Sequence, residues 1–267
     1  MSRILLFRTW GSQRIKILVV GVALTIWSAL LPIVYGVFGQ TFRDIIESGF
    51  IPEELTQFGG GDIFTLSGSI ALGAIHPISL ILNSVFAVGF ATAAIAGERQ
   101  RGTLEVMLAR PISRRTAYVT LLVATLTFVA VAVLATMVGA VIGSAISGVL
   151  DELAVDRLPL VWLNGFLLFS AFAAIGLAAS VSFDRLTPAL GITAGIVVVM
   201  YFLEVLGTFW PDAEVLQPYS LFHYYQPKFV LEGDAPLINF VLPALVAIVA
   251  IAWALFEFPR RDLAAPS

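Results

Sequence analysis

Six long apolar runs, separated by shorter polar segments, dominate the hydrophobic pattern of this chain. A helix needs about 20 mainly apolar residues to cross the hydrocarbon core of a bilayer. None of the runs shows the alternation of apolar and polar residues that a transmembrane barrel strand requires. The pattern therefore predicts an all-α protein with a single transmembrane domain over residues 1–267. The predicted spans are 17–38, 77–96, 117–142, 160–183, 188–209 and 237–258.

The composition agrees with this pattern. Of the 267 residues, 59% are hydrophobic and 12% are charged, whereas soluble domains carry about 25% charged residues. We therefore expect a multi-pass integral membrane protein. The chain has no cysteine, which excludes disulfides, thiolate metal sites and cysteine catalysis.

The basic residues predict how the chain is oriented. Six spans place both termini on one side of the membrane, together with the loop 97–116 and the turn 184–187. That side carries 12 of the 15 Lys and Arg residues, and an excess of these residues marks the cytoplasmic side. We expect both termini inside, in the plasma membrane. The 12 residues are Arg3, Arg8, Arg14, Lys16, Arg99, Arg101, Arg110, Arg114, Arg115, Arg185, Arg260 and Arg261.

Short elements are expected around the spans. Residues 1–16 combine arginines with apolar side chains and suit an interfacial helix; alternatively, this basic end only sets the orientation. Residues 63–75 are apolar and are followed by His76-Pro77, which predicts a short external or re-entrant helix with a break at Pro77. The aromatic segment 210–236 suits an outer interfacial belt or short helices dipping into the outer leaflet, and a gate for cargo is the alternative.

Two features predict helix neighbours. The fourth and fifth spans are joined only by the turn 184–188, so they should be antiparallel neighbours. Small residues four apart, at Gly139 and Gly143 and again at Gly191 and Gly195, permit close helix contact.

Few polar groups in the spans could carry chemistry. The chain has no phosphate-binding loop of the form GxxxxGK[ST], and no nucleophile–base pair stands out, so we assign no catalytic, cofactor-binding or metal-binding residue. His76 and His223 are expected to be structural. Glu204 is the one carboxylate well within a span. It could line a polar vestibule or simply reach the outer interface.

The loop 97–116 (GERQRGTLEVMLARPISRRT) is the densest charged segment. Gly102 should end the second span, and Thr103 can cap a short helix over 104–110, which Pro111 follows. Leu104, Met107 and Leu108 would form an apolar stripe on that helix. Ser113 can cap the next helix. The stripe requires cover by membrane, by the protein itself or by a partner; a helix that only anchors the loop is the alternative.

This loop resembles the signature of type-2 ABC transporter (ABC-2) permeases. The resemblance lies in residues 96–105 (AGERQRGTLE) and 108–114 (LARPISR), supported by His76-Pro77 and by Arg260-Arg261-Asp262. In that family the pattern is a Glu, basic residues, GT, L-[DE], two hydrophobic residues and P-[VI]-S-R. The six-span plan with an N-terminal interfacial helix covers the whole chain.

The resemblance implies an ATP-driven exporter. Two permease subunits, alike or different, would pair with two copies of a separate ATP-binding-cassette ATPase, which would hold ATP and Mg; no nucleic acid is implied. A coupling helix in the loop would dock on the ATPase. The implied contact residues are Glu98, Arg101, Gly102, Thr103, Leu104, Glu105, Leu108, Arg110 and Pro111.

The cargo and two other functional classes stay open. Drug, lipid, peptide or metal-related cargo is compatible with the sequence, and an apolar cavity lined by the second and fifth spans would favour amphipathic cargo. One alternative is an ATP-independent channel or secondary transporter, which would transport alone in an ion gradient. The other is a membrane scaffold or intramembrane enzyme, which would have no ATPase partner.

Overall fold

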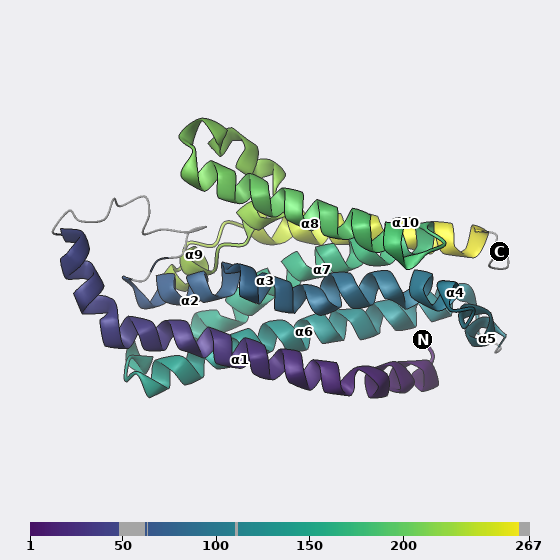
Figure 1. The fold of residues 1–267 in the computed structure, drawn as a ribbon, viewed down its shortest axis with the longest axis horizontal. Helices are drawn as coiled ribbons and strands as arrows, with labels where there is room; N and C mark the ends of the chain where they lie inside the picture. The colour runs from purple at the N-terminus through teal and green to yellow at the C-terminus, as the bar shows by residue number, and fades with distance from the viewer. Residues whose placement is uncertain (48–61, 63, 110–111, 262–267) are drawn as a thin grey trace.

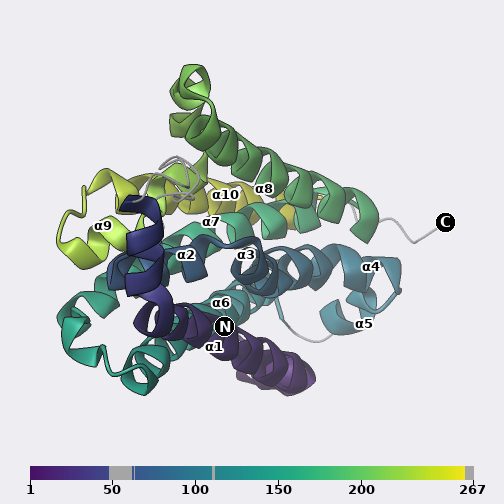
Figure 2. The same cartoon turned by 60° about the vertical axis from the view of Figure 1, so that its left-hand side comes forward.

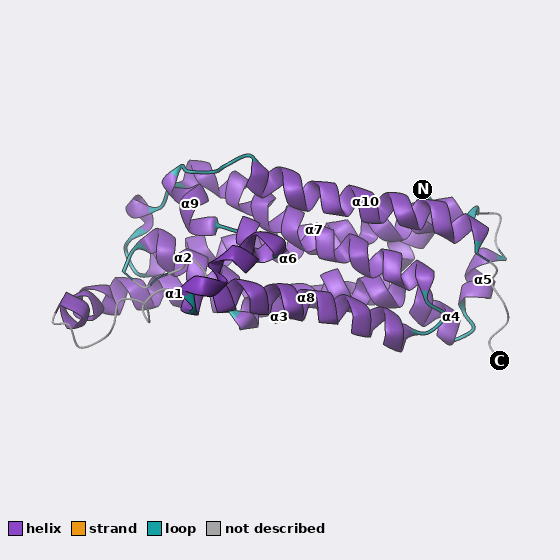
Figure 3. Ribbon diagram, turned by 90° about the horizontal axis from the view of Figure 1, so that it is seen from above, coloured by secondary structure: helices purple, strands orange, loops and turns teal. Residues whose placement is uncertain are grey.

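The computed structural model describes residues 1–47, 62, 64–109 and 112–261, and in these residues every regular element is a helix (Figures 1 and 3). Five helices are long and apolar enough to cross a bilayer, and a bent helix pair supplies a sixth candidate. These counts confirm the all-α class and its apolar spans. The long helices are α1 (Arg3–Glu47), α6 (Arg114–Ile146), α7 (Leu158–Ser182), α8 (Leu186–Phe209) and α10 (Ile238–Arg260).

Helix α1 is continuous and includes residues 3–16, which were predicted to belong to a separate interfacial helix. It runs for 45 residues without a break between residues 16 and 17. The expected boundary is therefore wrong. Within residues 3–17 the residue with the lowest helix propensity is Gly11, and a single glycine destabilises a helix by only about 1 kcal/mol relative to alanine. At about 1.5 Å per residue, the helix is roughly twice as long as a bilayer core is thick.

The chain bends where His76 precedes Pro77, as predicted. Helix α2 (Leu66–Ile75) is followed by α3 (Pro77–Ser84), and the chain is bent by 48° between the arms Leu66–Ile75 and Pro77–Phe90. The Nδ1 atom of His76 accepts a hydrogen bond from the Ile78 nitrogen at 3.3 Å, and its ring lies 4.6 Å from that of Trp27. His76 therefore has a structural role, capping α3 and packing on α1.

The second span is helical from Pro77 to Gln100, but it is not a regular α-helix. Two π-helical segments, η2 (Val85–Phe90) and η3 (Ala93–Gly97), interrupt it, and α4 (Glu98–Gln100) completes it. A π-helical turn displaces the usual backbone hydrogen bonds. In η3 the side chain of Ser180 compensates: its Oγ accepts from the nitrogens of Ile95 and Ala96 at 3.0 and 2.9 Å and donates to the Thr92 carbonyl at 2.7 Å.

Helix α7 lies at the centre of the bundle and contacts α6, α8 and α10 (Figure 1). The main core is aromatic. Phe128 of α6 packs edge-on against Trp10 and Phe90, with ring centroids 5.0 and 5.1 Å away. The contact between α7 and α8 confirms that the spans joined by the turn 184–188 are neighbours.

One of the two predicted small-residue contacts forms. A Cβ atom on Gly139 would lie 2.4 Å from the Thr25 carbonyl oxygen, and one on Gly143 would lie 2.2 Å from that of Ala29. Glycine thus permits the close approach of α1 and α6 (Figure 2). The second prediction is wrong within this subunit, because the α8 positions Gly191 and Gly195 face open space.

The short elements cluster at one end of the bundle. The segment 210–236 forms η6 (Pro211–Tyr219), η7 (Leu221–Tyr224) and α9 (Pro227–Glu232), which confirms short helices there. The linker after α6 contains η4 (Leu150–Glu152) and η5 (Val155–Arg157). The start of α1 and the end of α10 lie at the opposite end, beside α4 and α5 (Leu104–Leu108) (Figure 1).

Candidate functional site

The loop after the second span is folded back on itself by Glu98. The Thr103 hydroxyl donates to Glu98 Oε2 at 2.6 Å, and Arg101 forms an ion pair with Oε1 of the same carboxylate. Gly102 makes the turn between them with φ of +69°, a conformation that favours glycine. The predicted break at Gly102 is confirmed, and the motif residues Glu98, Arg101, Gly102 and Thr103 form one connected unit.

This arrangement keeps Glu98 ionised. Burial raises the pKa of its carboxyl group, but the hydrogen bonds from Thr103 and Arg101 and the positive charges of Arg101 and Arg8 outweigh that effect. The pKa of Glu98 therefore lies below its ordinary value. At neutral pH the carboxylate is a fixed acceptor that holds the loop in this shape.

Thr103 does not cap α5 with its side chain, contrary to the prediction. It occupies the position before the helix with helical angles, and its hydroxyl bonds to Glu98 instead. A hydrogen bond to a carboxylate is roughly twice as strong as one between neutral groups, which explains this preference. The other predicted cap is confirmed, because Ser113 Oγ accepts from the Thr116 nitrogen at 3.1 Å.

Helix α5 presents one covered face and one open face. Leu104 is 2% exposed and packs in a cluster with Tyr118 and Phe258, so the protein itself covers this part of the predicted stripe. Glu105 and Val106 are exposed, Val106 by 69%. The side chains of Met107 and Leu108, and residues Arg110 and Pro111, lie outside the described part of the structure. The open face is available to a partner.

A set of contacts that the motif did not indicate braces the loop against the rest of the bundle. Asp184, in the α7–α8 turn, forms ion pairs with Arg99 at 2.7 Å and with Arg261. The side-chain oxygen of Gln100 accepts from the Leu186 nitrogen at 2.9 Å. Asp184 was missed because its partners are far away in sequence. The bracing links the loop to α8 and to the end of α10.

An apolar groove lies between the second and fifth spans. Its volume is about 470 Å³, and residues of α3, η2 and α8 line it, including Val88, Ala194 and Val198. Tyr201 also lines it, and its hydroxyl is buried without a hydrogen-bond partner among the described residues. The second and fifth spans thus line an apolar groove, but it is open to the surface, with Val198 65% exposed, and is not the central cavity that was expected.

Glu204 lies about one turn further along α8 and is not among the residues that line this groove. Its side chain is 16% exposed, and its Oε2 lies 3.8 Å from His223 Nδ1. Burial lowers the pKa of His223, partly offset by the charge of Glu214, so the imidazole is uncharged at neutral pH. The two groups face each other near the end of the bundle that holds η6 and η7. Whether Glu204 belongs to a vestibule stays a prediction.

The profile described as ABC-2 family transporter protein matches residues 14–263. The chain belongs to the ABC-2 transporter family. The match covers almost the entire sequence, from within α1 to beyond the end of α10 and including the braced loop, and it confirms the resemblance seen in the loop motif. A search of curated proteins finds no match.

Membership of the ABC-2 family assigns the protein to membrane transport as a multi-pass permease. Permeases of this family generally lack an ATPase site of their own and normally act with ATP-binding-cassette ATPases. In this ABC-2 permease, the described residues contain no group of three or more His, Asp or Glu side chains that could hold a metal ion.

Proposed function

We propose that this protein is the membrane-spanning subunit of an ATP-driven exporter, and that the loop containing α4 and α5 docks on a separate cytoplasmic ATP-binding-cassette ATPase. The observation that carries the proposal is the build of this loop. The exposed side of the loop, with Glu105 and Val106, lies at the end of the bundle that also holds the first and last described residues. Glu98 and Asp184 brace the other side of the loop.

The bracing gives a route for coupling. Closure of the ATPase on ATP would push α5, and the push would pass through Glu98 into the second span and through Asp184 into the α7–α8 turn. The second and fifth spans, which would move, are those that line the apolar groove. ATP and Mg would be bound by the ATPase, and two permease subunits would pair in the complex.

The groove favours an amphipathic cargo. Its walls are mainly apolar. The hydroxyl-bearing residues that line it are Ser84 and Tyr201, and the Tyr201 hydroxyl has no hydrogen-bond partner within the described residues. A small number of polar groups in an apolar site fixes the orientation of a ligand. A cargo with an apolar body and one hydrogen-bonding group would match this lining.

Affinity purification of the tagged protein from native membranes, followed by ATPase assays, tests the docking proposal. The wild-type permease should retain a soluble ATPase subunit and raise its rate of ATP hydrolysis. Glu105→Lys should lower both retention and stimulation about 10-fold or more, because one lost charged contact is worth about 1.4 kcal/mol or more. Asp151→Lys, a charge reversal at an exposed acid at the other end of the bundle, is the control and should behave as wild type. A permease that purifies alone under conditions that preserve comparable complexes would refute the proposal and favour an ATP-independent transporter.

A further inference from the structure

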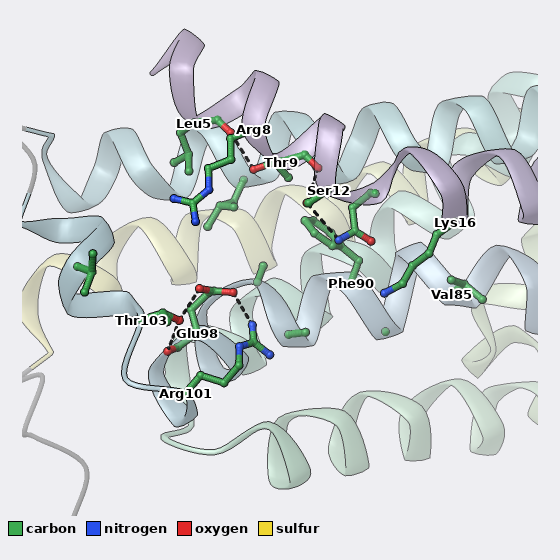
Figure 4. A pocket seen from close by; sticks show the side chains of 16 residues that line it. Leu5, Arg8, Thr9, Ser12, Lys16, Val85, Phe90, Glu98, Arg101 and Thr103 are labelled. Atoms are coloured by element: carbon green, nitrogen blue, oxygen red, sulfur yellow. Dashed lines mark hydrogen bonds and ion pairs between the residues drawn. The ribbon is translucent and has the colours of Figure 1, made fainter.

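A second cavity, larger than the groove, opens between the start of α1 and the loop end of the second span. Its volume is about 770 Å³. The first four turns of α1 form one wall, and η2, η3 and α4 form the other (Figure 4). The coupling loop supplies part of the rim, through Glu98, Arg101, Thr103 and Val106, but the proposed export function assigns no role to the α1 wall of this cavity.

Positive charge dominates the polar part of the cavity. Arg8 and Lys16 point into it from α1, and Arg101 lines the opposite wall near Glu98 (Figure 4). Glu98 is the one acidic residue among the lining side chains, and Arg101 and Thr103 already bind its carboxylate. Arg8 and Lys16 form no salt bridge with an acidic group in the described parts of the chain. The charge of Arg8 lowers the pKa of Glu98, but within the described residues neither Arg8 nor Lys16 is engaged in an ion pair.

The spacing of Arg8 and Lys16 along α1 places both side chains on the same side of the helix. Residues 8, 12 and 16 recur every four positions and so lie on the same side of a helix. Arg8 and Lys16 are separated by about 12 Å along the axis, and Ser12 and Gln13 lie between them on the cavity wall. The Ser12 hydroxyl donates to the Thr9 carbonyl at 2.8 Å, and Gln13 Nε2 donates to Ser12 Oγ at 3.4 Å. The two cations and the second N–H of the Gln13 amide are therefore the donors left for the oxygens of a phosphate or carboxylate head.

The remaining lining is apolar. Val85, Phe90 and Ala93 of the second span face the cavity, together with Leu5 and Leu121. A free inorganic anion would leave this surface without a partner. An anion attached to an apolar chain would cover both parts, because apolar area removed from water stabilises the complex.

We propose that this cavity binds an anionic amphiphile, with its phosphate or carboxylate head between Arg8 and Lys16 and its apolar chain against Val85, Phe90 and Ala93. The site lies on the α1 side of the second span and the apolar groove on the α8 side, although Val85 and Gly89 line both. The proposal does not depend on the export function. A bilayer phospholipid and a fatty-acid-like cargo share the required chemistry.

Binding can be measured directly on the full-length protein in an uncharged detergent. The probes are short-chain phosphatidylglycerol, phosphatidylcholine with the same chains, and glycerol phosphate without chains. We expect phosphatidylglycerol to bind at least about 10-fold more tightly than either of the other two. A fatty acid of similar length that competes with phosphatidylglycerol would mark a site open to any anionic amphiphile, whereas lack of competition would assign it to the phospholipid head.

The variants separate the cavity from general surface charge. Arg8→Gln with Lys16→Gln should weaken phosphatidylglycerol binding about 10-fold or more. The control, Arg3→Gln with Arg14→Gln, removes the same charge from exposed positions of α1 outside the cavity and should change binding less than about 2-fold. Ala93→Phe fills space at the apolar wall without changing the charge, and it should weaken the binding of phosphatidylglycerol. This variant also tests the site if the double variant Arg8→Gln with Lys16→Gln does not fold.

Two results would overturn the proposal. Equal weakening by both double variants would mean a diffuse attraction between the basic helix and anionic lipid. Glycerol phosphate binding as tightly as phosphatidylglycerol, with Ala93→Phe having no effect, would mean a site for free anions.

Discussion

The hydroxyl of Ser180 on α7 accepts a hydrogen bond from the backbone nitrogen of Ala96 on the second span at 2.9 Å. The same hydroxyl bonds to Ile95 and Thr92, so one side chain satisfies three backbone groups of a π-helical segment. All of these groups are buried away from water. The irregular part of the second span is thereby fixed to the centre of the bundle, one turn before the loop that begins at Glu98.

The first prediction follows from this contact. Ser180→Ala should lower the free energy of unfolding by about 1–3 kcal/mol, because it leaves buried N–H groups without acceptors. Ser170→Ala is the matched control on the same helix: Ser170 is also buried, but its hydroxyl has no hydrogen-bond partner in the described structure, so its removal should be neutral or slightly stabilising. Thermal unfolding in detergent checks both. Equal midpoints for the two variants would show that Ser180 is not needed by the π-helical segment.

The second prediction concerns the close contact of α1 with α6. Gly143→Ala should destabilise the protein by about 1–3 kcal/mol, because its Cβ would lie 2.2 Å from the Ala29 carbonyl oxygen and the helices must move apart. Gly191→Ala makes the same change on α8, where nothing lies within 4 Å, and should be neutral or slightly stabilising. Thermal unfolding distinguishes the two. Similar midpoints would mean that α1 and α6 are not in tight contact.

The third prediction is a pH dependence at the far end of the bundle. Asp62 is 4% exposed and accepts from the Lys228 ammonium at 2.7 Å, which joins the start of α2 to α9. Burial raises the pKa of Asp62, but Lys228 and the backbone N–H groups of Phe64 and Thr65 outweigh it, so the pKa lies below its ordinary value. The ion pair therefore contributes stability above the ordinary Asp pKa of about 4 and loses it as the pH falls through the lowered value.

Asp62→Asn should consequently destabilise the protein by about 1–3 kcal/mol at pH 7, and the difference from wild type should shrink below about pH 4. Asp234→Asn, at an exposed position in the same region, is the control and should have little effect at any pH. Urea unfolding across this pH range provides the measurement. A difference that stays constant down to pH 2 would argue against the ion pair.

The fourth prediction concerns the apolar groove. Ala194→Phe should fill part of it and reduce transport of a fluorescent amphipathic dye in proteoliposomes containing the permease and its ATPase, while ATPase retention stays unchanged. Val199→Phe places the same ring on a position of α8 outside the groove, 57% exposed, and should leave dye transport intact. Equal transport by both variants would mean that the dye does not pass through this groove.

Much of the fold could be predicted from hydropathy, because bilayer thickness and backbone hydrogen bonding leave few alternatives to helices. Proline and glycine also acted locally, so the bend at Pro77 and the break at Gly102 were predictable. The continuity of α1 from its basic start into the first span was not predictable, because a basic amphipathic segment and a span can form one helix when no helix-breaking residue lies between them.

Polar contacts between residues far apart in the chain could not be predicted from the sequence. Glu98, Arg101 and Thr103 were expected in one loop because the motif places them together. Asp184, Ser180 and Lys228 act on partners at least 77 residues away, and nothing in their local sequence indicates those partners. The π-helical segments were likewise hidden, because a uniformly apolar run carries no signal for a changed hydrogen-bond register.

The most direct test of the central claim uses the absence of cysteine from this chain, which makes single-cysteine variants unambiguous. Val106→Cys on α5 and Val215→Cys on η6 would carry a photoreactive crosslinker at positions that are 69% and 71% exposed and lie at opposite ends of the bundle. The account predicts that Val106→Cys crosslinks to the copurifying ATPase subunit and that Val215→Cys does not. A crosslink from Val215→Cys alone, or an ATPase that copurifies without any crosslink at position 106, would contradict it.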